Sequence, residues 1–167
     1  MLNALSTRQV FLLTALLTAV GMGFAFWLEY YLGLAPCPLC MTQRAFVILV
    51  GVICLLAAIH NPQTLGRKLY AGAGLLAAIG GGAVAGRHIY LQNLPEDLVP
   101  ACGPPLEYLL DTLPFLEVVN TVLMGDGNCA DVVWTFMGLS IPEQTLLFFI
   151  ALGLICVWQV MRFENKP

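Results

Sequence analysis

Four long apolar stretches limit what this chain can fold into. Only 10% of its 167 residues are charged and 59% are hydrophobic, whereas a soluble domain has roughly 25% charged residues. A helix of about 20 apolar residues can cross the hydrocarbon core of a bilayer. Stretches of about this length lie at 10–28, 43–60, 69–89 and 145–162. The sequence therefore predicts an all-α integral membrane protein, a four-helix transmembrane bundle that forms a single domain over residues 1–167.

The first stretch has an alternative interpretation as a cleaved signal peptide, because Arg8 precedes it and small residues lie near its middle. Its apolar run is longer than the roughly 7 to 15 residues of a signal-peptide core. It also ends in a group of aromatic residues, Trp27, Tyr30 and Tyr31, as a helix does where it leaves the bilayer. We therefore expect a retained transmembrane helix.

The distribution of charge favours one orientation of the bundle, because cytoplasmic loops carry an excess of Lys and Arg. Basic residues lie before the first stretch, between the second and third, and after the fourth: Arg8, Arg67, Lys68, Arg162 and Lys166. The segment 90–144 has eight acidic residues and no Lys or Arg. We expect both termini in the cytoplasm, and the loops 29–42 and 90–144 on the outer face.

This topology divides the six cysteines into two groups. Cys54 and Cys156 fall inside predicted spans, where an unpaired cysteine usually behaves as a small buried hydrophobic residue. The other four fall in the outer loops: Cys37, Cys40, Cys102 and Cys129. Disulfides persist on that side of a bacterial membrane. Two local pairs are the natural arrangement.

The first outer pair forms a C-x-x-C motif, Cys37 to Cys40. A disulfide in so small a ring constrains the chain little, so thiol–disulfide exchange explains the motif better than stapling. A Cys102 to Cys129 disulfide would close a loop of 28 residues, worth roughly 3 to 4 kcal/mol. That pair is either a structural staple or a partner in exchange. Zinc is a further interpretation of four thiols, but a second C-x-x-C or a spaced His pair is missing, and we expect no metal.

Three polar residues lie where the predicted helices meet the outer boundary of the membrane. Arg44 follows Cys40 by four residues, and Arg87 and His88 end the third span. Simple snorkelling of the arginines toward water is one interpretation. The functional interpretation is a polar pocket beside Cys40, in which Arg44 and His88 donate hydrogen bonds to a membrane-soluble acceptor and stabilise a thiolate.

The long acidic loop contains two stretches, 106–113 and 115–123, whose apolar residues recur at helical spacing. We expect short helices at the membrane surface. They either pack onto the bundle or hold Cys102 and Cys129 near the bilayer, within reach of Cys37.

Taken together, these features resemble the DsbB family of disulfide bond formation proteins over nearly the whole chain. The resemblance rests on the four spans, the C-x-x-C with Arg44, the sequence RHIYLQ at 87–92, and the second cysteine pair. The segment 129–142, which begins with Cys129-Ala130 and contains Trp134 and Phe136, is the most specific local match.

The resemblance implies a thiol:quinone oxidoreductase of the bacterial inner membrane that reoxidises a periplasmic DsbA-like thiol oxidase. The partner would attack Cys102, Cys129 would then attack Cys37, and Cys40 would face a ubiquinone or menaquinone. Arg44, His88 and Arg87 would line the quinone site, and the bilayer lipid surrounds it. The alternative is a structural membrane protein with two inert disulfides. A reductase that carries electrons outward would need a cytoplasmic thiol, and no cysteine lies in a predicted cytoplasmic loop. The sequence has no basic patch for nucleic acid.

Overall fold

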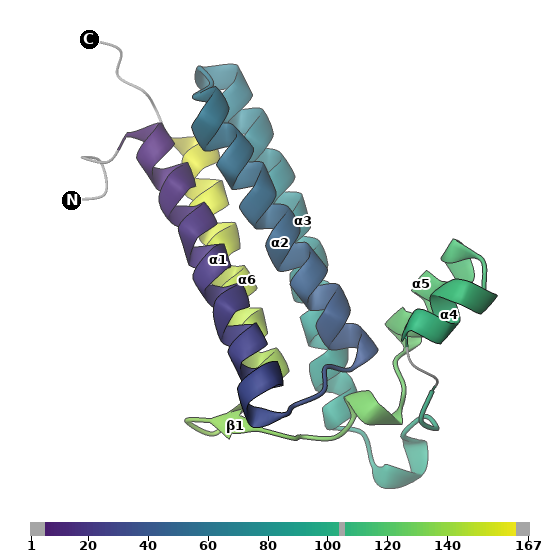
Figure 1. Cartoon of the computed structure of the whole chain (residues 1–167). Helices are drawn as coiled ribbons and strands as arrows, with labels where there is room; N and C mark the ends of the chain where they lie inside the picture. The colour runs from purple at the N-terminus through teal and green to yellow at the C-terminus, as the bar shows by residue number, and fades with distance from the viewer. Residues whose placement is uncertain (1–5, 104–105, 163–167) are drawn as a thin grey trace.

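The computed structural model describes residues 6–103 and 106–162, and four long helices form a bundle (Figure 1). They are α1 (Thr7–Leu32), α2 (Pro38–His60), α3 (Thr64–Gln92) and α6 (Ile141–Met161). Each is long and apolar enough to cross a membrane. The prediction of an all-α membrane bundle is confirmed. Lys166, one of the basic residues used to orient the chain, lies outside the described residues.

The helices are longer than the apolar stretches because capping residues, rather than hydropathy, fix where they begin and end. Ser6 caps α1 in a capping box with Gln9, which satisfies backbone N–H groups of the first turn. Gly33 ends α1 with a left-handed backbone at φ 68°, a conformation that glycine adopts without strain. α2 begins at Pro38, directly after its cap residue Cys37. The C-x-x-C motif, expected in a loop, therefore lies at a helix N-terminus.

Small residues let the central helix pack closely against its neighbours. α3 lies between α2 and α6, and α1 packs on α2. A Cβ atom on Gly81 would lie 2.2 Å from Cζ of Phe149 in α6, so α6 can approach only because this residue has no side chain. The main core contains Phe11, Val50 and Leu152. Close helix packing thus replaces the hydrophobic effect that holds a soluble bundle together.

α1 begins and α6 ends at the same end of the bundle (Figure 1), where the Gln159 side chain donates a hydrogen bond to the carbonyl of Thr7 at 3.4 Å. Arg67, which is buried at the start of α3, donates to the carbonyl of Arg162 at that end. The start of α2 and the segment between α3 and α6 lie at the opposite end. They carry Cys37, Cys40, Cys102 and Cys129. Four membrane crossings, an even number, bring the end of α6 back to the side on which α1 begins, as observed. The distribution of charge alone assigns which of the two ends faces the cytoplasm.

The described residues between α3 and α6, 93–103 and 106–140, form six short elements. They are η2 (Glu96–Leu98), α4 (Leu106–Thr112), α5 (Phe115–Met124), η3 (Gly127–Cys129), β1 (Thr135–Phe136) and β2 (Leu139–Ser140). The strands pair antiparallel, Thr135 with Ser140 and Phe136 with Leu139. The two short helices that the sequence predicts are present, and they project from the side of the bundle (Figure 1). Their position relative to a membrane surface stays a prediction.

A second apolar cluster attaches this segment to the bundle. Val118 and Val122 of α5 pack with Leu39 of α2, Leu91 of α3 and Leu109 of α4. The same cluster contains Cys129, whose side chain is fully buried. Burial of each large aliphatic side chain contributes roughly 1.5 to 3 kcal/mol in a soluble setting. The cluster therefore fixes the position of Cys129 relative to the N-terminus of α2.

Candidate functional site

The C-x-x-C motif forms the first turn of α2. Cys37 is the N-cap, and its Sγ accepts a hydrogen bond from the backbone N–H of Cys40 at 3.4 Å. Pro38 occupies the first helical position, where its missing N–H costs nothing. Both thiols are half-buried, and all six cysteines are unpaired in the structure. The positive end of the helix dipole favours a thiolate at this position.

Cys129 lies against Cys37, although 92 positions separate them in the sequence. The Sγ atoms of the two residues and a ring nitrogen of His88 all lie within 4.8 Å of one another. The backbone N–H of Cys129 donates to the carbonyl of Asp126 at 3.0 Å, which shapes the η3 turn. The hydrogen bond to Cys37, together with burial, raises the pKa of the Cys129 thiol. Cys129 therefore faces the sulfur of Cys37 from a buried position.

Cys102 is exposed, in contrast to Cys129. It lies beside η3, because a Cβ atom on Gly127 would come within 3.1 Å of its Sγ. The backbone N–H of Gly127 donates to the carbonyl of Ala101 at 3.3 Å, which joins the two segments. The second pair thus has one thiol that a soluble protein can reach and one that faces the bundle.

His88 is buried in α3 and lies between the two thiols of α2. Its Nε2 is 3.8 Å from Cys37 Sγ, and its Nδ1 is 4.0 Å from Cys40 Sγ. The side-chain amide of Gln43, which is also buried, lies 3.1 Å from Nδ1. When Gln43 donates to Nδ1, a neutral imidazole carries its proton on Nε2, toward Cys37. His88 is therefore placed to donate a hydrogen bond to the sulfur that undergoes exchange.

Gln43 is a site residue that the sequence analysis did not predict, although the sequence contains a sign of it. It is a polar residue directly before Arg44, in the first turns of a helix that is otherwise apolar. A polar side chain in a spanning helix usually faces the interior of the bundle or a cavity. Two polar residues in succession at the end of a predicted span therefore could have marked the site.

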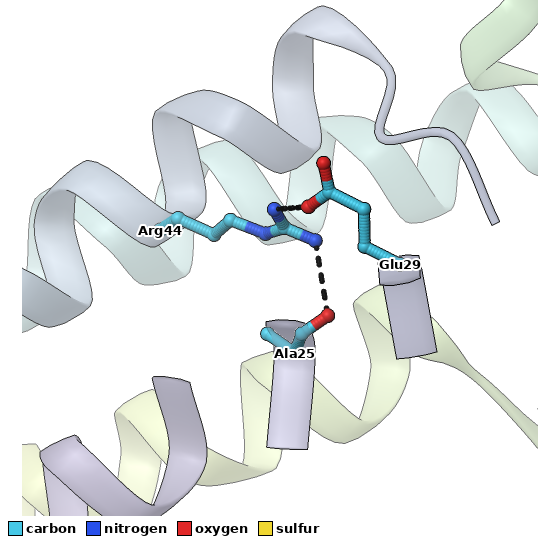
Figure 2. A network of polar contacts seen from close by, with 3 residues as sticks. All are labelled: Ala25, Glu29 and Arg44. Carbon is cyan, nitrogen blue, oxygen red and sulfur yellow. Dashed lines mark hydrogen bonds and ion pairs between the residues drawn. The ribbon is translucent and has the colours of Figure 1, made fainter. Parts of the chain in front are cut away.

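Arg44 is tied to α1 rather than directed freely toward water. Figure 2 shows its guanidinium between the two α1 residues that it contacts. It forms an ion pair with Glu29, and it donates to the carbonyl of Ala25 at 3.3 Å. The guanidinium also lies over the ring of Phe26, 5.5 Å from its centre. Glu29, the only acidic residue of α1, was not singled out from the sequence. Simple snorkelling does not describe this arrangement.

Arg87 lies elsewhere, although the sequence places it beside His88. Its guanidinium donates to the carbonyls of Leu123 at 3.3 Å and Met124 at 3.0 Å. These carbonyls end α5, where a cation stabilises the unpaired acceptors. Arg87 does not line the cavity described below, as far as the described residues define it. Arg87 thus holds the end of α5 in this structure, and a quinone titration of an Arg87 variant decides whether it also contacts the cofactor.

A cavity of about 300 Å³ opens beside the C-x-x-C motif. Its polar wall includes Cys37, Cys40, Arg44 and His88. The rest of its surface is largely apolar, with side chains from α1, α2 and α6 and from the segment after η3: Ala25, Leu28, Val47, Val133, Trp134 and Phe148. An apolar cavity with a few convergent polar groups is typical of a small-molecule site.

The fold and the site together define a multi-pass membrane oxidoreductase of disulfide bond formation, with a dithiol at a helix N-terminus and a second cysteine pair above it. The chain belongs to the DsbB family. The family model described as disulfide bond formation protein DsbB matches residues 7–159.

Curated relatives with the name disulfide bond formation protein B cover most of the chain. The protein of Saccharophagus degradans is 54% identical over 138 residues, 83% of each chain. That of Hahella chejuensis is 51% identical over 154 residues, 92% of each chain. That of Stutzerimonas stutzeri is 46% identical over 157 residues, 94% of this chain and 96% of its own. The similarity therefore extends over all four membrane helices and the segment that carries the second cysteine pair.

Proposed function

We propose that the protein reoxidises a periplasmic DsbA-like dithiol protein and passes the electrons to a quinone in the bacterial inner membrane. The membrane orientation in this proposal follows from the basic residues, which put the cysteine-bearing end on the periplasmic side. Cys102 to Cys129 is the outer disulfide, and Cys37 to Cys40 is the inner one. The partner class comes from the family to which the chain belongs.

The observation that carries the proposal is the contact between one member of each pair. Cys129 Sγ lies within 4.8 Å of Cys37 Sγ, while Cys102 is exposed to solvent. A disulfide that only staples the loop would have no need of a contact between Cys129 and Cys37. Exchange through a mixed disulfide requires a thiolate to approach one sulfur of the target disulfide. The contact supports Cys129 as the attacking group and Cys37 as the sulfur attacked.

The first exchange begins at the exposed sulfur. A thiolate of the reduced partner attacks Cys102, the Cys102 to Cys129 bond breaks, and Cys129 leaves as a thiolate. Cys129 then attacks Cys37, the Cys37 to Cys40 bond breaks, and Cys40 leaves as a thiolate. His88 donates a hydrogen bond toward Cys37 during this step, and the helix dipole stabilises the Cys40 thiolate.

The second exchange restores the outer pair. The other partner thiol attacks the mixed disulfide, so the partner leaves oxidised and Cys102 is freed. Cys102 attacks Cys129, which reforms the outer disulfide and releases Cys37. The Cys37 and Cys40 dithiol then gives up two electrons and two protons as it closes. Arg44 and His88 would hold a quinone beside Cys40, and this quinone would supply the acceptor for the two electrons and two protons.

The cavity beside Cys40 fits this acceptor. Its largely apolar wall suits a lipid-soluble ring. Arg44 supplies hydrogen-bond donors for one carbonyl oxygen, and the Nε2–H of His88 is available to a second oxygen when it is not directed at Cys37. Glu29 and the Ala25 carbonyl hold the guanidinium of Arg44 in place. Arg44 and His88 approach the cavity from two different helices.

Turnover of purified protein tests the proposal. The full chain in detergent, supplied with a reduced DsbA-like protein and a short-chain ubiquinone or menaquinone analogue, should bleach the quinone absorbance while the partner is oxidised. Cys40→Ser and Cys102→Ser should each abolish turnover, and Cys54→Ser, a change inside α2, is the matched control. Quinone reduction by Cys40→Ser would contradict the mechanism. Four outer cysteines that stay oxidised with partner and quinone present would identify two inert disulfides instead.

A further inference from the structure

Three metal-binding atoms meet at the sulfur-rich end of the bundle. Cys37 comes from the start of α2, His88 from the last turns of α3, and Cys129 from η3. The two Sγ atoms and a ring nitrogen of His88 lie within 4.8 Å of one another. The sequence argument against zinc compares only ligands that lie close together in the sequence, such as a second C-x-x-C or a spaced His pair. Here the folded chain brings together ligands from three separate segments.

The spacing of these atoms is close to that of a tetrahedral metal site. Zinc binds cysteine sulfur at about 2.3 Å and histidine nitrogen at about 2.0 to 2.1 Å. Two ligand atoms at tetrahedral angles then lie roughly 3.5 to 3.8 Å apart. Cys37 Sγ and His88 Nε2 are 3.8 Å apart. Small rotations of the side chains would therefore complete the geometry.

The surroundings also bear on the binding of a cation. A metal-binding histidine usually has a hydrogen-bond partner on its other ring nitrogen, which holds the ring in place. With a metal on Nε2, His88 carries its proton on Nδ1, and Gln43, 3.1 Å from Nδ1, accepts a hydrogen bond from that N–H once its side-chain amide turns its oxygen toward the ring. Asp131 lines the cavity beside the cysteines, and the segment around it lacks Lys and Arg from residue 90 to 143. Arg44 and the N-terminus of α2 add positive charge to the same cavity, so the two thiolate ligands, rather than the field of the site, would hold the cation.

We infer that Cys37, Cys129 and His88 form a redox-gated site for a thiophilic divalent cation, with Zn²⁺ as the representative ion. Binding displaces two thiol protons and transfers no electrons. A disulfide that includes Cys37 or Cys129 removes a thiolate ligand, so only the dithiol state binds the ion. The fourth position faces the cavity and is open to water. The binding itself does not depend on the proposed relay. Its consequence does, because a bound ion withholds the two sulfurs that must exchange.

Equilibrium binding to the full-length reduced protein tests this inference. The protein in detergent, free of oxygen, is titrated with Zn²⁺ against a chromophoric chelator. We expect one tightly bound ion per chain, and loss of this ion when a disulfide oxidant is added. Cys129→Ser and His88→Ala should each weaken binding at least 10-fold. Cys40→Ser and Cys102→Ser are the matched controls and should keep the wild-type affinity.

The controls separate this site from a simple C-x-x-C chelate. Loss of binding in Cys40→Ser with unchanged binding in Cys129→Ser would overturn the assignment, as would the absence of a tight ion in the reduced wild type. Alkylation read by mass spectrometry gives a second test without substitutions. Zn²⁺ should protect the half-buried Cys37 of the wild type from a maleimide while the exposed Cys102 still reacts, and equal protection of Cys102 would contradict the site. Neither measurement uses a quinone, so failure of the relay would leave both results interpretable.

Discussion

His88 lies where the two thiols of α2 and the amide of Gln43 meet. Burial of an imidazole is costly unless its nitrogens have partners. Here both nitrogens have one, and Gln43 either donates to Nδ1 or accepts from it, according to which way its amide faces. The role of His88 in exchange therefore depends on a neighbour that itself has no redox chemistry.

Replacement of Gln43 tests this dependence. Gln43→Leu keeps the size of the side chain but removes the amide that orients His88. We expect thiol exchange between Cys129 and Cys37 to slow by about 10-fold, similar to the loss of an outer partner at other histidine sites. Rapid-quench alkylation measures this step directly. Gln63→Leu, an exposed change before α3, is the control, and an equal rate in both variants would remove Gln43 from the mechanism.

Arg44 and Arg87 look equivalent in the sequence, because each lies at the membrane edge of a predicted span. Their contacts separate them, since Arg44 lines the cavity and Arg87 holds the end of α5. We expect Arg44→Ala to raise the KM for quinone at least 10-fold, because about 1.4 kcal/mol of binding corresponds to that factor. Arg87→Ala should leave this KM unchanged. A quinone titration of both variants provides the measurement, and equal KM values would refute the distinction.

At the scale of the elements, α3 owes its place to glycine. The neighbouring helices approach so closely at Gly81 that a methyl group would collide with Phe149. Other glycines of α3, such as Gly72, have open space around them. The close contact between α3 and α6 therefore depends on having glycine, which has no side chain, at position 81.

Substitution of these two glycines should therefore have opposite effects. We expect Gly81→Ala to destabilise the bundle by about 1 to 3 kcal/mol, the usual cost of overpacking. Gly72→Ala should be neutral or stabilise by up to about 1 kcal/mol, because alanine favours the helix. Unfolding in mixed detergent compares the two variants. A loss of stability at Gly72 equal to that at Gly81 would mean that helix packing is not the cause.

The sequence predicts the elements better than their ends. Hydropathy locates all four membrane helices, because a bilayer imposes length and apolarity on any helix that crosses it. It misses the start of α2 by five residues (43 predicted, 38 observed), because a Cys–Pro cap carries no hydropathy signal. The contact of Cys129 with Cys37 was implied by family resemblance alone. Gln43 and Glu29 were missed because only packing shows which polar residues face the cavity.

For the whole molecule, α1 begins and α6 ends at one end of the bundle, and the redox residues lie at the other. The charge distribution then sets the orientation of all four helices together, because inverting one helix alone would no longer put the start of α1 and the end of α6 on the same side of the membrane. This orientation decides which compartment supplies the thiols.

Labelling in intact cells tests the orientation. We expect a membrane-impermeant maleimide to label Cys102 after mild reduction, because this thiol is exposed and the charge distribution predicts that it lies on the periplasmic side. In a Cys102→Ser background, Gln63→Cys in the loop between α2 and α3 should be labelled only after the membrane is permeabilised. Labelling of Gln63→Cys in intact cells would reverse the topology.

Cys37 Sγ accepts a hydrogen bond from the backbone N–H of Cys40. It is also the sulfur that Cys129 is proposed to attack. A thiolate is a stronger hydrogen-bond acceptor than a disulfide sulfur. Each catalytic cycle would therefore tighten and loosen the first turn of a membrane-crossing helix. The NMR chemical shift of the Cys40 backbone amide would then report the redox state of the C-x-x-C motif, with no reporter group attached to the protein.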